Sequence, residues 1–196
     1  MKLIFTFLLI FSTSVMADTI LFLGDSLTEG YQLQKEDAYP AVIEKTLKKT
    51  FKNIKVINGG VSGATSASGL KRMDWYLKAK PDFMVLALGA NDGLRGMKID
   101  QTEKNLAKVI EKAQERGITV ILAGMKMPTN YGEPYRTQFE NIFPKLAKKY
   151  SLKLIPFILD GVGGQPQYNL PDGIHPNPKG HEIMAKNVLK VLEPLL

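Results

Sequence analysis

The residues best suited to covalent chemistry are an early serine and two late histidines. Ser26 lies in the segment GDSLTEG, directly after an apolar run, and the chain's only histidines, His175 and His181, both lie in the segment DGIHPNPKGH. A serine hydroxyl is a weak nucleophile at neutral pH, and it needs a neighbouring base, usually an imidazole oriented by a carboxylate. If Ser26 is a nucleophile, its base must be one of these two histidines.

The residues around His175 favour it over His181 as that base. Asp172 precedes His175 by three residues, and Gly173 and Pro176 predict a turn between them and the next helix. In such a turn a carboxylate can hold one imidazole nitrogen and leave the other free to accept the serine proton. Taken alone, the same residues are equally compatible with a loop that only introduces a helix. No carboxylate is placed in this way for His181, which we interpret as a surface or packing residue.

Four short segments of the chain, taken in order, resemble those of the SGNH or GDSL hydrolases. The segments are GDSLTEG from Gly24, NGGVSGATSASGL from Asn58, LGAND from Leu88 and DGIHPNPKGH from Asp172. Within that family, the chain is similar to small periplasmic thioesterases, lysophospholipases and arylesterases. The resemblance spans nearly the whole chain after its first residues, and four segments in order are far more specific than any one alone.

This resemblance implies roles for five residues. Ser26 matches the family's nucleophile, and Asp172 and His175 match its acid and base. The backbone N–H of Gly63 and the side-chain amide of Asn91 match its oxyanion donors. Attack by an activated serine, with these donors stabilising the oxyanion, requires no metal and no organic cofactor.

The rest of the chain alternates short aliphatic runs with longer amphipathic ones. Strands are predicted over residues 19–23, 54–57, 83–88, 119–123 and 153–156. Helices are predicted over residues 38–51, 66–79, 101–116, 135–150 and 178–195. Because the strands are apolar on both faces, we expect an α/β fold, a three-layer sandwich with a central parallel five-stranded sheet flanked by helices. The resemblance implies the same flavodoxin-like architecture.

The five candidate residues fall where such a fold binds ligands, beyond the carboxyl ends of the strands. Ser26 and Asn91 each follow a predicted strand by three residues, and Gly63 follows the strand between them in sequence. Asp172 and His175 lie in the loop before the last predicted helix. All five are therefore predicted to share one edge of the sheet.

The first residues have the pattern of a secretory leader. Lys2 precedes an apolar run over residues 3–11 that is too short to span a bilayer, and small residues precede Ala17. We predict a signal peptide over residues 1–17, cleaved after Ala17, and a single hydrolase domain over residues 18–196, in the periplasm or secreted. An uncleaved anchor is the alternative. With no cysteine, the chain forms no disulfide.

The composition of the chain narrows the range of binding partners to expect. The chain has 26 basic and 19 acidic residues, a formal charge of +7, but its lysines are scattered through the predicted helices. No basic cluster is interleaved with aromatic residues, so we expect no nucleic-acid partner. A hydrophobic content of 44% is enough for the core of one domain. We expect a monomer that acts on a small acyl ester or thioester and makes at most transient contact with membrane lipids.

Other interpretations of the same segments stay open. Gly24 and Gly30 could simply shape a turn with Ser26 as a helix cap, and the sequence from Asn91 is also typical of a turn. Ser62 lies in GVSGA, close to the G-x-S-x-G pattern of the α/β-hydrolases, and it too follows a predicted strand. That alternative nucleophile leaves GDSLTEG unexplained and demands more strands than the chain supplies.

The substrate is indicated less clearly. The long loop over residues 123–139 contains Met125, Met127, Tyr131 and Tyr135 and is expected to border the site, where adaptable methionines would suit an acyl chain. The same side chains would equally suit packing beneath the loop. A carbohydrate O-acetyl esterase with a polar cleft and a catalytically silent binding module of the same fold are the alternatives to an acyl esterase or thioesterase.

Overall fold

The computed structural model describes residues 18–196, so the predicted leader lies outside the described residues. Five parallel strands form one sheet in the order β2-β1-β3-β4-β5. They are β1 (Thr19–Gly24), β2 (Lys55–Gly60), β3 (Phe83–Ala87), β4 (Thr119–Ala123) and β5 (Lys153–Ile155). All five predicted strands are confirmed, with some of their ends shifted.

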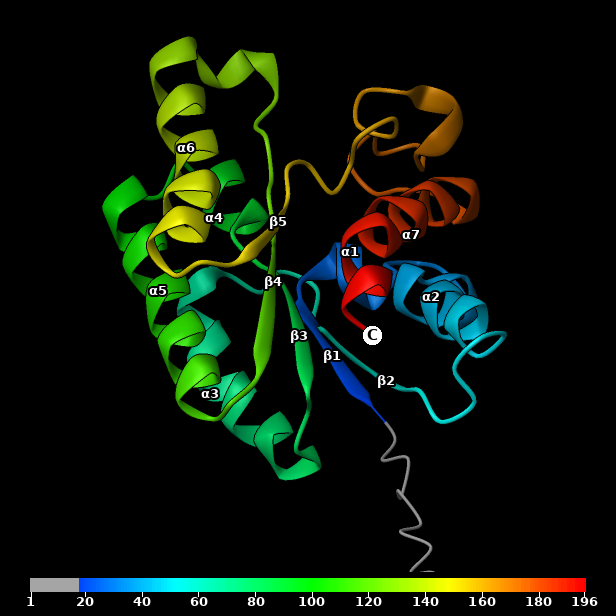
Figure 1. Cartoon of the computed structure of the whole chain (residues 1–196). Helices are drawn as coiled ribbons and strands as arrows, with labels where there is room; N and C mark the ends of the chain where they lie inside the picture. The colour runs from blue at the N-terminus through cyan, green and yellow to red at the C-terminus, as the bar shows by residue number, and fades with distance from the viewer. Residues whose placement is uncertain (1–17) are drawn as a thin grey trace, which may run out of the picture.

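Helices cover both faces of the sheet, which confirms the predicted three-layer sandwich (Figure 1). One face carries α3 (Ser66–Tyr76), α4 (Ala90–Leu94), α5 (Ile99–Glu115) and α6 (Glu133–Lys149). The other carries α1 (Ser26–Glu29), α2 (Tyr39–Leu47) and α7 (Pro178–Leu192). Single 3-10 turns are η1 (Lys35–Asp37), η2 (Leu77–Ala79), η3 (Thr129–Tyr131), η4 (Pro166–Tyr168) and η5 (Glu193–Leu195). The short helices α1 and α4 were not predicted.

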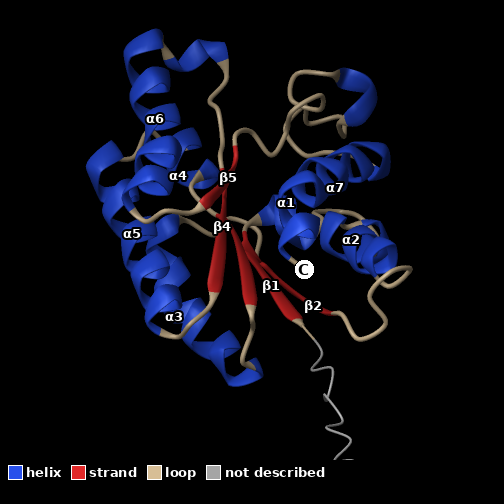
Figure 2. Ribbon diagram, viewed as in Figure 1, coloured by secondary structure: helices blue, strands red, loops and turns tan. Residues whose placement is uncertain are grey.

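The interior strand β1 is buried along its whole length, because β2 and β3 flank it and helices cover it on both faces (Figure 2). Burying each large apolar side chain stabilises the fold by about 1.5–3 kcal/mol. The ring of Phe22 on β1 packs edge-on against Tyr39 at the start of α2, with their centroids 5.5 Å apart. This core anchors the strand from which the Ser26 segment continues.

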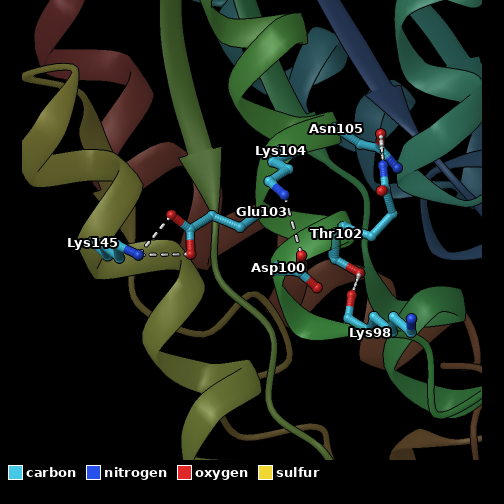
Figure 3. A network of polar contacts seen from close by, with 8 residues as sticks. Lys98, Asp100, Thr102, Glu103, Lys104, Asn105 and Lys145 are labelled. Atoms are coloured by element: carbon cyan, nitrogen blue, oxygen red, sulfur yellow. Dashed lines mark hydrogen bonds and ion pairs between the residues drawn. The ribbon is translucent and has the colours of Figure 1, made fainter.

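The outer surface of α5 carries exposed ion pairs (Figure 3). Lys104 pairs with Asp100 one turn away at 3.2 Å, and Lys145 of α6 reaches Glu103 at 2.8 Å. Exposed pairs of this kind contribute about 0–1 kcal/mol each, so the pair within α5 and the pair between α5 and α6 both have little effect on stability. Within residues 18–196, no helix is both long enough and apolar enough to cross a membrane.

The strand register brings three strand ends level at one edge of the sheet. Gly24 at the end of β1 lies opposite Gly60 of β2 and Ala87 of β3. Ser26, Gly63 and Asn91 follow these ends by two, three and four residues. The segments that carry three of the five candidate residues therefore leave the sheet side by side.

Candidate active site

Ser26 is the first residue of α1 and follows β1 after a single intervening residue. That residue, Asp25, is the helix cap, since its Oδ1 accepts a hydrogen bond from the Leu27 N–H at 3.1 Å. The turn is so tight that a Cβ atom on Gly24 would lie 1.9 Å from Oγ1 of Thr28. The glycine is thus required by the turn, and the Ser26 side chain has no capping role.

The loop before α7 brings Asp172 and His175 to Ser26, a residue 149 positions away from His175. Oδ1 of Asp172 accepts backbone N–H bonds from Ile174 at 2.9 Å and from His175 at 3.0 Å. Its Oδ2 lies 2.7 Å from Nδ1 of His175, and Nε2 of the same ring lies 3.0 Å from Oγ of Ser26. The three side chains form a continuous line of hydrogen bonds.

The charge state of Asp172 determines the direction of these bonds. Burial alone would raise the pKa of this carboxyl, but the hydrogen bonds from His175 and Ile174 outweigh it and lower the pKa to about 2. The ionised carboxylate can only accept, so Nδ1 of a neutral His175 ring carries the hydrogen. Nε2 is then the lone-pair nitrogen that faces the Ser26 hydroxyl.

Tyr31 is a further residue of the site that sequence reasoning missed. Its ring packs against the His175 imidazole with centroids 4.4 Å apart and a tilt of 36°. Its own N–H donates to the Ser26 carbonyl at 3.1 Å, so the backbone of Tyr31 is attached to the start of α1. The sequence shows an aromatic residue five positions after the serine, but it does not show that this residue contacts a histidine 144 residues later.

Gly63 and Asn91, the two predicted oxyanion donors, lie on neighbouring segments at the same sheet edge as Ser26. Gly63 has a φ of 76°, a conformation that favours glycine, in the loop between β2 and α3. Asn91 lies in α4 and donates from Nδ2 to the Ala64 carbonyl at 3.0 Å. An amide group has two N–H donors, so this bond holds the side chain and leaves one donor for a ligand.

Asp92 is a buried carboxylate that links the segment of Asn91 to the start of α3. It accepts from the Ser66 N–H at 2.8 Å and from the Ser66 hydroxyl, and Thr102 of α5 also donates to it at 3.3 Å. Because Ser66 is the first residue of α3, Asp92 ties the start of that helix to the segment of Asn91. Its position in LGAND marked the segment in the sequence, but not this partner.

Arg72 of α3 braces the strand ends beneath Ser26. Its guanidinium donates to the Gly24 carbonyl at 2.9 Å and to the Gly59 carbonyl, so one side chain joins β1 to β2. Burial lowers the pKa of Arg72, but an arginine stays charged at neutral pH. An arginine on an amphipathic helix gave no sequence signal for this role.

Ser62, the alternative nucleophile, lacks the surroundings that a nucleophile requires. Its hydroxyl donates to the carboxylate of Glu29, and its N–H donates to the same oxygen at 2.7 Å. Within residues 18–196, no hydrogen bond joins Ser62 to either histidine, whereas His175 bonds to Ser26. The arrangement of polar groups therefore favours Ser26.

His181 is a packing residue, as one of the two sequence interpretations held, and it is not on the surface. Its side chain is 1% exposed, and Nδ1 accepts the Tyr39 N–H at the start of α2 at 3.0 Å. Burial, with a smaller contribution from the charge of His175, lowers the pKa of His181 to about 4. The neutral ring is the form that can accept this bond.

Asp25 is the other buried ionisable group at the site. Among the described residues no group bonds to its Oδ2, and burial raises the pKa of this carboxyl to about 7. With this pKa, the carboxyl of Asp25 changes its protonation state near neutral pH. Asp25 directly precedes Ser26, so this change takes place next to the site. Because burial shifts the pKa of Asp25 on folding, its contribution to the free energy of unfolding varies with pH.

The predicted long loop over residues 123–139 is shorter in the structure and covers residues 124–132, because β4 ends at Ala123 and α6 begins at Glu133. Met125 and Met127 are buried, so the interpretation of these side chains as core is correct. Tyr131 donates to the Leu94 carbonyl at 2.8 Å, and Tyr135 donates to that of Met97 at 3.0 Å. Tyr131 thus joins the loop, and Tyr135 the first turn of α6, to the segment that follows Asn91.

Ser26, His175 and the ionised Asp172 are in line at the carboxyl edge of a parallel sheet. This arrangement is that of a serine hydrolase built on an α/β fold. Within residues 18–196, no cluster of three or more His, Asp or Glu side chains is placed to hold a metal ion. Residues 22–183 match the GDSL-like Lipase/Acylhydrolase family. The chain belongs to this family and is an ester-bond hydrolase.

Named relatives agree with this assignment over nearly the whole chain. The chain is 39% identical over 182 residues to thioesterase 1/protease 1/lysophospholipase L1 of Escherichia coli, an alignment that covers 92% of this chain and 86% of the relative. It is 36% identical to an arylesterase of Vibrio mimicus, with 92% and 91% covered. A crystal structure of TesA superposes with a TM-score of 0.88 at 38% identity, covering 91% of this chain and all of that one.

Proposed function

We propose that the protein cleaves carboxylic esters or thioesters of acyl chains through an acyl-enzyme on Ser26. One observation carries the proposal, the line of hydrogen bonds from Ser26 through His175 to Asp172. An activated serine at this position is the group needed to attack an acyl carbonyl.

The geometry supports a two-stage reaction. In the first stage, Oγ of Ser26 attacks the acyl carbonyl carbon while Nε2 of His175 takes the hydroxyl proton, and Asp172 stabilises the resulting imidazolium. The tetrahedral intermediate collapses, and His175 gives this proton to the departing oxygen or sulfur. In the second stage, His175 takes a proton from water as the water oxygen attacks the acyl-enzyme, and then returns it to Ser26.

The charge that develops on the carbonyl oxygen needs donors already in place. The N–H of Gly63, the free amide N–H of Asn91 and the N–H of Ser26 are the donors at this edge of the sheet. All three lie on segments that follow level strand ends. Their origin at one edge of the sheet supports a shared role on the oxyanion, while His175 contacts the Ser26 hydroxyl from its own loop.

The surroundings of the site support an apolar acyl group. Val61 and Ile174 are large apolar side chains that remain 45% and 47% exposed, and they lie within two residues of Gly63 and beside His175 respectively. Such exposed apolar groups at a site favour an apolar ligand. A small cavity nearby, of about 10 Å³, is lined by seven apolar residues, Leu27, Ala87, Leu88, Ala90, Ala123, Met125 and Ile158.

The size of this cavity bears on where the acyl chain lies. A volume of about 10 Å³ is close to that needed for a single water molecule. We therefore expect a long chain to extend over the exposed apolar side chains of Val61 and Ile174 and not to enter this cavity. The names of the relatives, which include thioesterase, lysophospholipase and arylesterase, support both oxygen esters and thioesters as substrates.

A panel of p-nitrophenyl esters from acetyl to palmitoyl, with acyl-thioesters and a lysophospholipid alongside, tests the proposal. We expect turnover of butyryl and longer esters that exceeds that of the acetyl ester, and turnover of at least one acyl-thioester. Turnover confined to acetyl esters, with acetylated glycans as the better substrates, would instead identify a carbohydrate O-acetyl esterase. No turnover of any member would identify a silent binding module.

We also propose that residues 1–17 are removed and that the protein works in the periplasm or outside the cell as a monomer, without nucleic acid and with transient lipid contact. The charge and apolar pattern of the first residues supports export. Amino-terminal sequencing of the exported protein is expected to begin at Asp18. A sequence beginning at Met1 would contradict cleavage.

A further inference from the structure

We propose that Glu29 is a positioning residue that holds the oxyanion loop, defined as residues 61–65, in register with Ser26. This inference rests on the proposed function, because it concerns the Gly63 N–H as an oxyanion donor. Glu29 has no part in the roles assigned above. It is exposed and lies at the end of the helix that Ser26 begins.

The contact between Glu29 and the loop is direct. A single carboxylate oxygen, Oε2, accepts both the backbone N–H of Ser62, at 2.7 Å, and the Ser62 hydroxyl. Ser62 immediately precedes Gly63, and its carbonyl belongs to the same planar peptide unit as the Gly63 N–H. Holding Ser62 by two groups therefore limits the directions in which that N–H can point.

Two other side chains hold the next residues of the loop from the opposite side. Arg95 donates to the Gly63 carbonyl at 3.2 Å, and Asn91 donates to the Ala64 carbonyl at 3.0 Å. Both belong to the segment that follows β3. Among residues 18–196, Glu29 is the only residue of the Ser26 helix whose side chain bonds to residues 62–64, and this contact adds to the backbone bond from the Val61 N–H to the Gly24 carbonyl.

The backbone around these contacts explains why such a tie is needed. Within the loop the Ala64 N–H bonds to the Val61 carbonyl at 3.0 Å, but Gly63 inside this turn has a φ of 76° and no side chain, so its own peptide is conformationally permissive. The end of β2 meets α1 closely, because a Cβ on Gly60 would lie 2.0 Å from the Glu29 nitrogen. Beyond this close contact the Val61 N–H bonds to the Gly24 carbonyl at 3.3 Å, and the Glu29 carboxylate is the following attachment to the segment that carries Ser26.

Kinetics of purified variants test this role. Because an oxyanion donor acts mainly in the transition state, we expect Glu29→Ala to lower kcat about tenfold with KM changed less than twofold. Glu29→Gln keeps an oxygen that accepts the Ser62 N–H, so we expect it to recover most of the loss. Glu36→Ala removes another exposed carboxylate nearby, one without a side-chain hydrogen bond in the described residues, and is expected to match the parent enzyme.

Three results would overturn the role of Glu29. They are an unchanged kcat in Glu29→Ala, an equal loss in Glu29→Gln, and a melting temperature so reduced in Glu29→Ala that the loss of activity follows from unfolding. A Ser26→Ala arm in the same assay separates this inference from the proposed function. If that variant stays active, the proposed function fails; if it is inactive while Glu29→Ala is normal, only the role of Glu29 fails.

Discussion

The two sides of the Ser26 hydroxyl are built in different ways. On the proposed proton-transfer side, His175 and Asp172 come from one loop and each side chain touches the next. On the proposed oxyanion side, the donors come from separate segments, and side chains of other elements hold the loop that carries Gly63. We therefore expect the first side to fail when any one group is lost, and the second to lose only part of its effect.

The largest effect is expected on the proton-transfer side. In Asp172→Asn, the amide oxygen keeps the backbone bonds to Ile174 and His175, so the amide nitrogen faces Nδ1 of the ring. That nitrogen donates a hydrogen, which forces the ring proton onto Nε2, where it can no longer accept from Ser26. We expect kcat to fall about 10⁴-fold.

Steady-state kinetics with a p-nitrophenyl ester measures this loss, and circular dichroism shows whether the fold is kept. A decrease of less than tenfold in a folded Asp172→Asn variant would mean that the carboxylate does not set the tautomer. The two sides of Ser26 would then no longer differ as described.

A smaller effect is expected on the oxyanion side. Asn91→Ala removes one amide donor but leaves the backbone N–H groups of Gly63 and Ser26, so we expect kcat to fall about 10²–10³-fold. Measurement of kcat and KM separately checks this, since the loss belongs in kcat. A loss as large as that of Asp172→Asn would show that the oxyanion side depends on one group after all.

His181 differs from His175, because we expect it to contribute to the stability of the fold and not to the reaction. The pKa of His181 is about 4 in the folded protein against an ordinary value of 6.5, so the unfolded chain binds the extra proton first as the pH falls. Its contribution is complete above pH 6.5 and is lost between pH 6.5 and about 4. The shift corresponds to about 3 kcal/mol of unfolding free energy.

Asp25 changes the free energy of unfolding in the opposite direction over much the same pH range. Its pKa is about 7 in the folded protein against 3.8, so its contribution is complete below pH 3.8 and is lost as the pH rises towards 7. We therefore expect the two groups to offset each other in the parent protein. Urea unfolding at pH 4.5 and 6.5 checks this, because His181→Asn should make the protein relatively more stable at the lower pH. An unchanged pH dependence in His181→Asn would contradict the assignment.

Much of the fold and the site was predictable from the sequence for a simple physical reason. Strands buried on both faces must be apolar throughout, so β1, β3 and β4 are visible as aliphatic runs. Parallel strands also end at one edge, which predicted that Ser26, Gly63 and Asn91 would share it. The turn residues around His175 indicated which histidine a carboxylate would orient.

What the sequence could not predict depends on short elements and long-range contacts. The helices α1 and α4 have four and five residues, too few to show a helical period. Tyr31, Arg72 and Glu29 each act on groups brought near them only by the sheet. The two methionines of the long loop are equally suited to a ligand and to the core, and only packing shows that they belong to the core.

The central claim is that Ser26 is the nucleophile, and covalent labelling tests it most directly. A fluorophosphonate probe is expected to label the parent protein and Ser62→Ala, because the Ser62 hydroxyl bonds to Glu29 and not to an imidazole. Ser26→Ala is expected to remain unlabelled under the same conditions. Labelling that survives in Ser26→Ala would contradict the account.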